Sequence, residues 1–145
     1  MKRAEQRGWR PHWGLIAEVS LPSGSAGRTS GDVDPALKLL WAYDLTERVS
    51  LGGNLNVAVP TEGGHRFVQA SASFTVAVAL TATVGSYVEY FGFYPGSDGE
   101  DATHVLNGGF TFLVTDDFQI DIRAGFGINE EAEDFLAGVG FSFRI

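Results

Sequence analysis

Hydrophobic and polar residues alternate with a period of two along most of the chain. Successive side chains of a β-strand point to opposite faces, so this period predicts strands that are apolar on one face and polar on the other. The clearest segment places Phe118, Ile120 and Ile122 on one face and Gln119 and Asp121 on the other. Eight strands are predicted, at residues 12–22, 35–44, 48–59, 66–77, 81–93, 103–114, 117–127 and 134–145.

The connections between these segments alternate between short and long. Short connections fall at 44–48, around 80–81 and at 115–117, and long polar ones at 22–34, 60–66, 95–102 and 129–134. A chain that crosses a layer and returns through short turns on one side and long loops on the other has the layout of an outer-membrane barrel. The predicted fold class is all-β: an antiparallel up-and-down meander of about eight strands forming all or part of a transmembrane β-barrel. Residues 12–145 make up this single domain, and residues 1–11 are an N-terminal remnant.

The polarity of the two faces decides between a membrane barrel and a soluble β-protein. A solvent-facing sheet surface normally carries many Lys and Glu residues, but the polar faces here hold mainly Ser, Thr, Asn, Gln and Gly. Their few ions are Glu18, Lys38, Glu89, Asp121, Arg123 and Arg144, while most acidic residues lie in the connections. Aromatic residues gather near strand ends, as in interfacial girdles. These features favour a membrane barrel. The alternatives are a soluble barrel or sandwich that binds a small apolar ligand inside, and a structural membrane barrel without a pore.

Strand parity assigns candidate residues to the two faces of the predicted barrel. The polar set is predicted to line the lumen and set its selectivity. It comprises Glu18, Lys38, Asn54, Asn56, Gln69, Glu89, Gln119, Asp121, Arg123 and Arg144. The apolar set is predicted to face lipid. It comprises Val49, Leu51, Leu55, Phe74, Phe118, Ile120, Ile122, Phe135, Val139, Phe141 and Phe143.

Composition and motifs exclude several classes of function. A net charge of −8 argues against nucleic acid as a partner, and the lack of Cys excludes disulfides and thiolate metal sites. The acidic runs 98–101 and 130–134 lack EF-hand spacing, and solvated loop charge explains them better than Ca²⁺ binding. His12, His65 and His104 are widely separated and no nucleophile-elbow sequence occurs. We therefore expect no metal, no cofactor and no catalytic site.

The N-terminus begins with basic residues but has no apolar core of a signal peptide after them. An exported protein needs such a signal. We therefore expect the chain to be a fragment or to carry a misassigned start.

The last segment, Gly138–Ile145, resembles the C-terminal strand of bacterial outer-membrane proteins, except that it ends in Ile where those strands usually end in Phe. The wider chain resembles the family of the MetA pathway of phenol degradation at Ala17–Gly24, Leu40–Asn54, Phe118–Asn129 and Asp134–Phe143. This resemblance implies the C-terminal part of an outer-membrane transporter for small hydrophobic or aromatic compounds. It also implies that the lipid bilayer and the outer-membrane assembly machinery are partners. The family has no catalytic motif to carry over, so the chain is not expected to be an enzyme.

Overall fold

All regular structure in the described part of the chain is β-strand. The computed structural model describes residues 8–24, 29–96 and 101–144. A two-stranded hairpin consists of β4 (Thr61–Glu62) and β5 (His65–Arg66). The eight long strands are β1 (His12–Ser20), β2 (Asp34–Asp44), β3 (Val49–Ala58), β6 (Gln69–Ala79), β7 (Val84–Pro95), β8 (Thr103–Thr115), β9 (Phe118–Gly127) and β10 (Leu136–Phe143).

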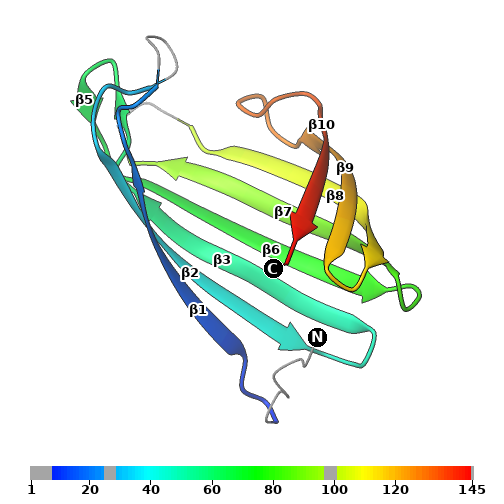
Figure 1. Ribbon diagram of the computed structural model, residues 1–145. Helices are drawn as coiled ribbons and strands as arrows, with labels where there is room; N and C mark the ends of the chain where they lie inside the picture. The colour runs from blue at the N-terminus through cyan, green and yellow to red at the C-terminus, as the bar shows by residue number, and fades with distance from the viewer. Residues whose placement is uncertain (1–7, 25–28, 97–100, 145) are drawn as a thin grey trace.

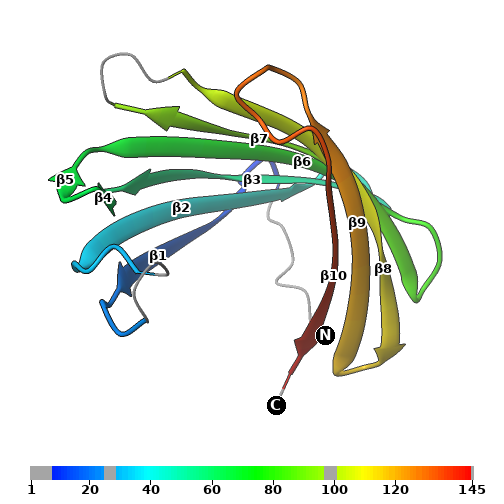
Figure 2. The ribbon, with the colours of Figure 1, turned by 90° about the horizontal axis from the view of Figure 1, so that it is seen from above.

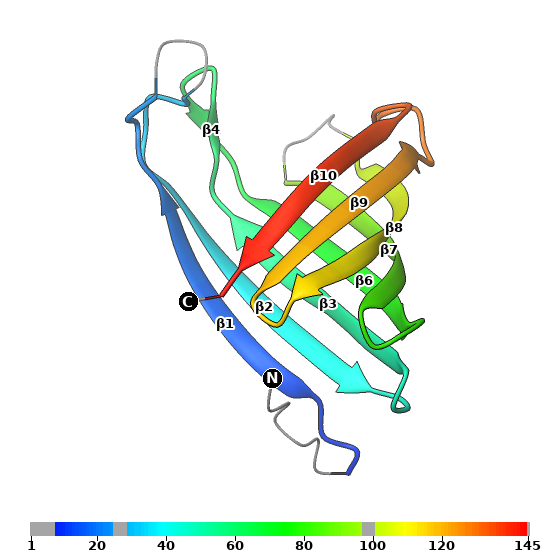
Figure 3. The same cartoon turned by 45° about the vertical axis from the view of Figure 1, so that its right-hand side comes forward.

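The long strands form one antiparallel sheet in chain order, β1-β2-β3-β6-β7-β8-β9-β10. The sheet curls into a half-barrel (Figure 1). A second view shows the same curvature from above (Figure 2). Strands β1 and β10 form the two margins (Figure 3), and within the described residues each of them pairs with one neighbour only. The predicted meander is confirmed, with every predicted strand end within three residues of the observed one.

Two short connections close with the same local structure. Thr46 Oγ1 accepts hydrogen bonds from the backbone amides two and three residues later, at 3.2 and 2.9 Å. Thr81 Oγ1 does the same at the same distances. A hydroxyl that satisfies turn amides fixes the loop length, and loop length sets the register of the following strand. The sequence repeats the pattern Leu-Thr-x-x-Val at these two turns.

The β4–β5 hairpin was not predicted, because residues 60–66 were interpreted as a plain connection. Its turn residues Gly63 and Gly64 have positive φ angles of 57° and 81°. Two consecutive positive φ angles are the requirement of the tight hairpin turn that favours glycine. The hairpin is tied to the sheet by Thr61, whose hydroxyl donates to Asp34 Oδ1 at 2.8 Å.

The register brings the polar positions of neighbouring strands together on one face. Lys38 pairs with Asn56, and Asn56 pairs with Ser71. The adjacent row pairs Leu39 with Leu55. Because register is uninterrupted from β1 to β8 and shifts only at the end of the β8–β9 pair, the alternation within each strand becomes a two-sided sheet.

The polar face is the concave one and the apolar face is convex. Asn107, on the polar face, is 3% exposed, whereas Phe141 and Val139, on the apolar face, are 76% and 78% exposed. The polar face also contains a hollow lined from β3, β6, β7, β8 and β9. Within the described residues Val105 is the only hydrophobic side chain that is buried. The polarity of this sheet is therefore the reverse of that of a soluble globular β-protein.

No helix in the described residues is long and apolar enough to cross a membrane.

Candidate functional site: the polar concave face

Nine of the ten predicted lumen residues share the concave face. The pairings that join them run from β1 to β9. These residues are Glu18, Lys38, Asn54, Asn56, Gln69, Glu89, Gln119, Asp121 and Arg123. The tenth, Arg144, follows the end of β10, and its guanidinium contacts Asp117 Oδ1 at 2.8 and 2.5 Å at the turn between β8 and β9. Arg144 therefore lies at the short-turn rim, apart from the other nine.

Uncharged polar side chains connect β3 and β6 on this face. Asn56 Nδ2 donates to Asn54 Oδ1 at 2.8 Å and to Ser71 Oγ at 3.0 Å. Asn56 Oδ1 is buried and has no hydrogen-bond partner within the described residues. This small network presents amide and hydroxyl groups to the interior without adding net charge.

Glu89 lies at the centre of a second network, which joins β6, β7 and β8. Its carboxylate accepts hydrogen bonds from Thr75 Oγ1 at 3.2 Å and from Asn107 Nδ2 at 3.1 Å. The sequence explains the arrangement, because the register places Glu89 opposite both Thr75 and Asn107. Asn107 is the most buried polar residue described, and its Oδ1 has no hydrogen-bond partner there. A half-buried carboxylate held by neutral donors keeps its acceptor capacity without a fixed counter-ion.

Glycines beside the charged residues of β9 let their side chains lie flat along the sheet. A Cβ atom on Gly138 would lie 3.1 Å from Arg123 Nε, and one on Gly140 would lie 2.6 Å from Asp121 Oδ2. Both side chains therefore lean across β10 toward its unpaired margin. Neither makes an ion pair with another residue in the described part of the chain. The side chain of Tyr87 likewise lies over a glycine of the neighbouring strand, because its hydroxyl would be 3.1 Å from a Cβ atom on Gly109.

The opposite margin of the sheet has its charges paired. Lys38 Nζ donates to Glu18 Oε2 at 2.5 Å, between the neighbouring strands β2 and β1. Both groups are partly exposed, so the pair contributes little to stability. The two margins therefore differ. At β1 the charged pair is complete within the β1–β2 hairpin, whereas the side chains of Asp121 and Arg123 lie over β10 without an ion pair among the described residues.

The convex face carries the predicted lipid-facing residues. Phe74, Ile122 and Phe143 illustrate the pattern, and all three are exposed. Trp41 lies across Gly53, with its Nε1 3.0 Å from a Cβ built there, and its ring contacts that of Phe74 at a centroid distance of 6.0 Å. Glycine in β3 thus allows a large ring to cover the backbone on the outside of the sheet.

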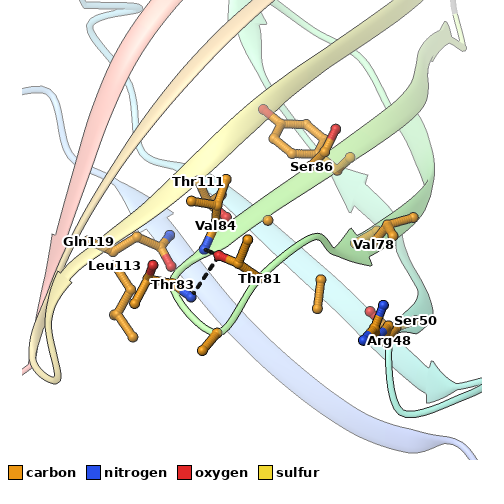
Figure 4. A pocket seen from close by; sticks show the side chains of 15 residues that line it. Arg48, Ser50, Val78, Thr81, Thr83, Val84, Ser86, Thr111, Leu113 and Gln119 are labelled. Carbon is orange, nitrogen blue, oxygen red and sulfur yellow. Dashed lines mark hydrogen bonds between the residues drawn. The ribbon is translucent and has the colours of Figure 1, made fainter.

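A hollow lies at the short-turn end of the sheet and is lined by both walls of the curl. Ser50 of β3, Thr111 of β8 and Gln119 of β9 contribute to it, and the Thr81 turn lies beside them (Figure 4). Its volume is about 340 Å³. The hollow therefore lies inside the curl of the sheet, where apolar side chains such as Leu113 line it together with the polar groups of Ser50, Thr111 and Gln119.

The described residues contain no group of three or more His, Cys, Asp or Glu side chains placed to hold a metal ion. Asp98 and Glu100 of the first acidic run lie outside the described residues. His104 donates its backbone amide to Asn129 Oδ1 at 2.8 Å, and its ring Nδ1 lies 2.7 Å from the Tyr90 hydroxyl. His104 therefore belongs to a hydrogen-bond cluster on the convex face.

The prediction from sequence missed some concave residues, because it assigned only Glu89 of β7 to the polar face and assigned no residue of β8 to either face. Thr75 was placed on the polar side but was not selected as a site residue, and Tyr87 and Asn107 were not selected at all. The parity of Glu89 in β7 and the register of β8 would have identified Tyr87 and Asn107. The concave face also carries Phe91 and Phe93, whose rings meet edge to face at 6.0 Å.

The sheet is a curled antiparallel meander with a polar inner face and an apolar outer face. These features define one wall of a β-barrel whose polarity is the reverse of that of a soluble β-protein. Residues 4–145 match the family described as "Putative MetA-pathway of phenol degradation". The chain belongs to that family, as its resemblance indicated. Searches of the curated proteins and of the solved structures each found no match.

Proposed function

We propose that the chain forms the wall of an outer-membrane β-barrel that passes small hydrophobic or aromatic compounds along its polar concave face. One observation carries the proposal: large apolar side chains of the long strands such as Val139 and Phe141 are more than three-quarters exposed, whereas the most buried polar side chain, Asn107, faces the interior. In water an apolar convex surface of this extent would be costly. In a bilayer it is the surface that a transmembrane barrel requires. The same observation counts against a soluble barrel that buries its apolar face.

The interior has the chemistry of a passage. Amides, hydroxyls and a few charges line it, with Phe91 and Phe93 among them. Such a surface can offer weak, repeated contacts to a solute that has an aromatic ring and a hydroxyl, and weak contacts allow a solute to enter and leave. The name of the family, which refers to phenol degradation, agrees with this solute class. No step in this role is catalytic, so the protein acts as a transporter and not as an enzyme.

A barrel also has to close along the margins of β1 and β10. Unpaired margins expose rows of backbone amides and carbonyls, which cannot remain unsatisfied in lipid. In the complete barrel both margins are paired with strands. Arg123 and Asp121, which lean over β10 toward that margin, then face the residues of the strand that pairs with it.

The test has two steps, which ask first whether the protein folds in a membrane environment and then whether solutes pass through it. The chain is expressed with a signal peptide and examined for heat-dependent gel migration and β-type circular dichroism, in detergent, in lipid vesicles and in plain buffer. We expect folding only in detergent or lipid. Vesicles that contain the folded protein should then admit phenol faster than a sugar of larger size and greater polarity. A monodisperse folded protein in plain buffer would overturn the membrane assignment, and equal phenol entry with and without protein would overturn the transport role.

A further inference from the structure

The concave face carries a second hollow, on the β1 side of the sheet, whose shape follows from the register. Its volume is about 430 Å³. Outward-pointing residues such as Trp13 and Trp41 contribute their backbone, not their side chains, to its floor. Two neighbouring rows of inward residues form the rest of it: Gly14, Leu40, Asn54 and Ser73 in one row, and His12, Ala42, Gly52, Thr75 and Glu89 in the other.

The floor of this hollow is open, because neighbouring side chains do not cover its glycines. The atom nearest to a Cβ built on Gly52 is the backbone oxygen of Trp41, at 3.5 Å, and on Gly14 the nearest atom is 3.7 Å away. By contrast, Gly109, an inward glycine of β8, lies under the Tyr87 hydroxyl, which would be 3.1 Å from its Cβ. The crowding of the inner face is therefore relieved at Gly52, and the backbone there is accessible to a flat group.

One carboxylate stands at the β7 end of the hollow. Glu89 is half-buried, and each of its carboxylate oxygens accepts one hydrogen bond, Oε1 from Thr75 and Oε2 from Asn107. An ionised carboxylate has about four acceptor positions. Because these two neutral donors are the ones found among the described residues, acceptor positions of Glu89 remain open to a further donor.

The cations of the concave face are directed away from this carboxylate. Lys38 Nζ pairs with Glu18, and the guanidinium of Arg123 lies over β10. Among the described residues that line the hollow, Glu89 and His12 are the titratable ones. The β7 end of the hollow therefore offers an acceptor whose negative charge is not neutralised by a basic side chain in the described part of the chain.

We propose that this hollow is a binding site for a small aromatic ring that carries a hydroxyl. The ring lies over Gly52 beside Leu40, and its hydroxyl donates a hydrogen bond to the carboxylate of Glu89. The inference rests on the proposed function, because it names one contact point of that passage. Two independent features select the ligand: the uncovered floor admits a flat group, and the open acceptor favours a donor and repels an anion.

The experiment measures binding at the hollow separately from passage. The ¹⁵N-labelled chain is folded in detergent micelles and titrated with phenol, toluene and benzoate, and the backbone amide signals of Gly52 and Glu89 are followed by NMR. Toluene has nearly the shape of phenol but no donor, and benzoate carries a negative charge. We expect phenol to shift both signals saturably, with binding of toluene and of benzoate each weaker by about tenfold or more.

Filling the floor tests where the ring lies. The Cβ of Gly52→Val makes only ordinary contacts, since the nearest atom is 3.5 Å away, and its methyl groups enter the hollow. This variant should bind phenol about tenfold more weakly than the unmodified chain. Ala58→Val is the matched control, because Ala58 lies on the same face of β3 but does not line the hollow. The control should leave the affinity for phenol unchanged.

Removing the charge tests the acceptor. Glu89→Gln keeps the size of the side chain and should lower the affinity for phenol roughly three- to tenfold, because a charged acceptor becomes a neutral one. It should raise the affinity for benzoate, because the repulsion between two carboxylates is lost. If Glu89 only supported the fold, both affinities would fall together. This pair of opposite changes decides the question even if Gly52→Val does not fold.

The outcomes also separate this inference from the proposed function. If phenol enters vesicles that contain the protein but shifts neither amide signal, the passage stands and the site is wrong. Equal loss of phenol binding in Gly52→Val and Ala58→Val would also overturn the site. Saturable binding at the hollow without phenol entry would overturn the transport role and support the site. Failure to fold in either detergent or lipid would overturn the membrane assignment and this inference with it.

Discussion

The two faces of the sheet are built from the same strands but differ in what holds them. On the convex face, large apolar residues such as Phe141 and Val139 are more than three-quarters exposed. On the concave face, hydrogen bonds connect Thr75, Glu89 and Asn107 across three strands. The curvature explains the contrast, since it crowds side chains inside and spreads them outside. The outer face therefore depends on its surroundings, and the inner face depends on its own contacts.

The largest expected effect comes from placing a charge on the outer face. Ile122→Arg should cost about 2–4 kcal/mol of folding free energy in lipid vesicles, because a mid-strand lipid-facing position desolvates the guanidinium. Urea titration in vesicles, followed by tryptophan fluorescence, measures this change. A cost near zero would mean that Ile122 does not face hydrocarbon, and the assignment of the two faces would be wrong.

Crowding on the inner face predicts a smaller loss from a single methyl group. A Cβ on Gly125 would lie 2.5 Å from Asn107 Cβ, so Gly125→Ala should destabilise the protein by about 1–3 kcal/mol. Gly14→Ala is the matched control, because the nearest atom to its Cβ, in Leu40, is 3.7 Å away. The control should be neutral or stabilising by up to about 1 kcal/mol. Equal effects of the two variants in the same urea titration would show that the inner face is not crowded at β8 and β9.

Removing a hydrogen bond from the inner network should have a moderate effect. Asn107→Ala leaves Glu89 with one donor fewer and should cost about 0.5–1.5 kcal/mol. Gln119→Ala, on the same face, should change stability by less than about 0.5 kcal/mol, because no side-chain hydrogen bond of Gln119 is found among the described residues. If both variants have equal stability, the network around Glu89 does not contribute to folding.

The smallest effect on stability is expected at Arg123, the sequence neighbour of Ile122 on the opposite face. Arg123→Ala should change the folding free energy by less than about 0.5 kcal/mol, since its guanidinium has no ion pair in the described residues. It should instead shift the ion preference of the passage toward cations, because a positive lumenal charge is lost. Reversal potentials in planar bilayers measure this shift, and an unchanged value would remove Arg123 from the lumen.

The two faces of a strand could be assigned from the sequence in some strands but not in others, and the reason is physical. In β9 the alternation of Phe118, Gln119, Ile120 and Asp121 is regular, so both faces could be assigned from sequence. In β7 the concave face holds Tyr87, Phe91 and Phe93 beside Glu89, so hydropathy does not separate the faces. The position of Tyr87 on the concave face was therefore missed, and that of Asn107 in β8 follows only from its pairing with Glu89.

The sequence by itself determined the strands, their two-sided polarity and the order of short and long connections, because side-chain direction in a strand follows from the local backbone alone. Repeated turn residues such as Thr46 and Thr81 are equally local. Only the tertiary structure decided which face is concave, because curvature is a property of many strands together. It also decided that Asn107 meets Glu89 and that Gly52 lies in one row with Glu89, since cross-strand neighbours are set by register between segments distant in sequence.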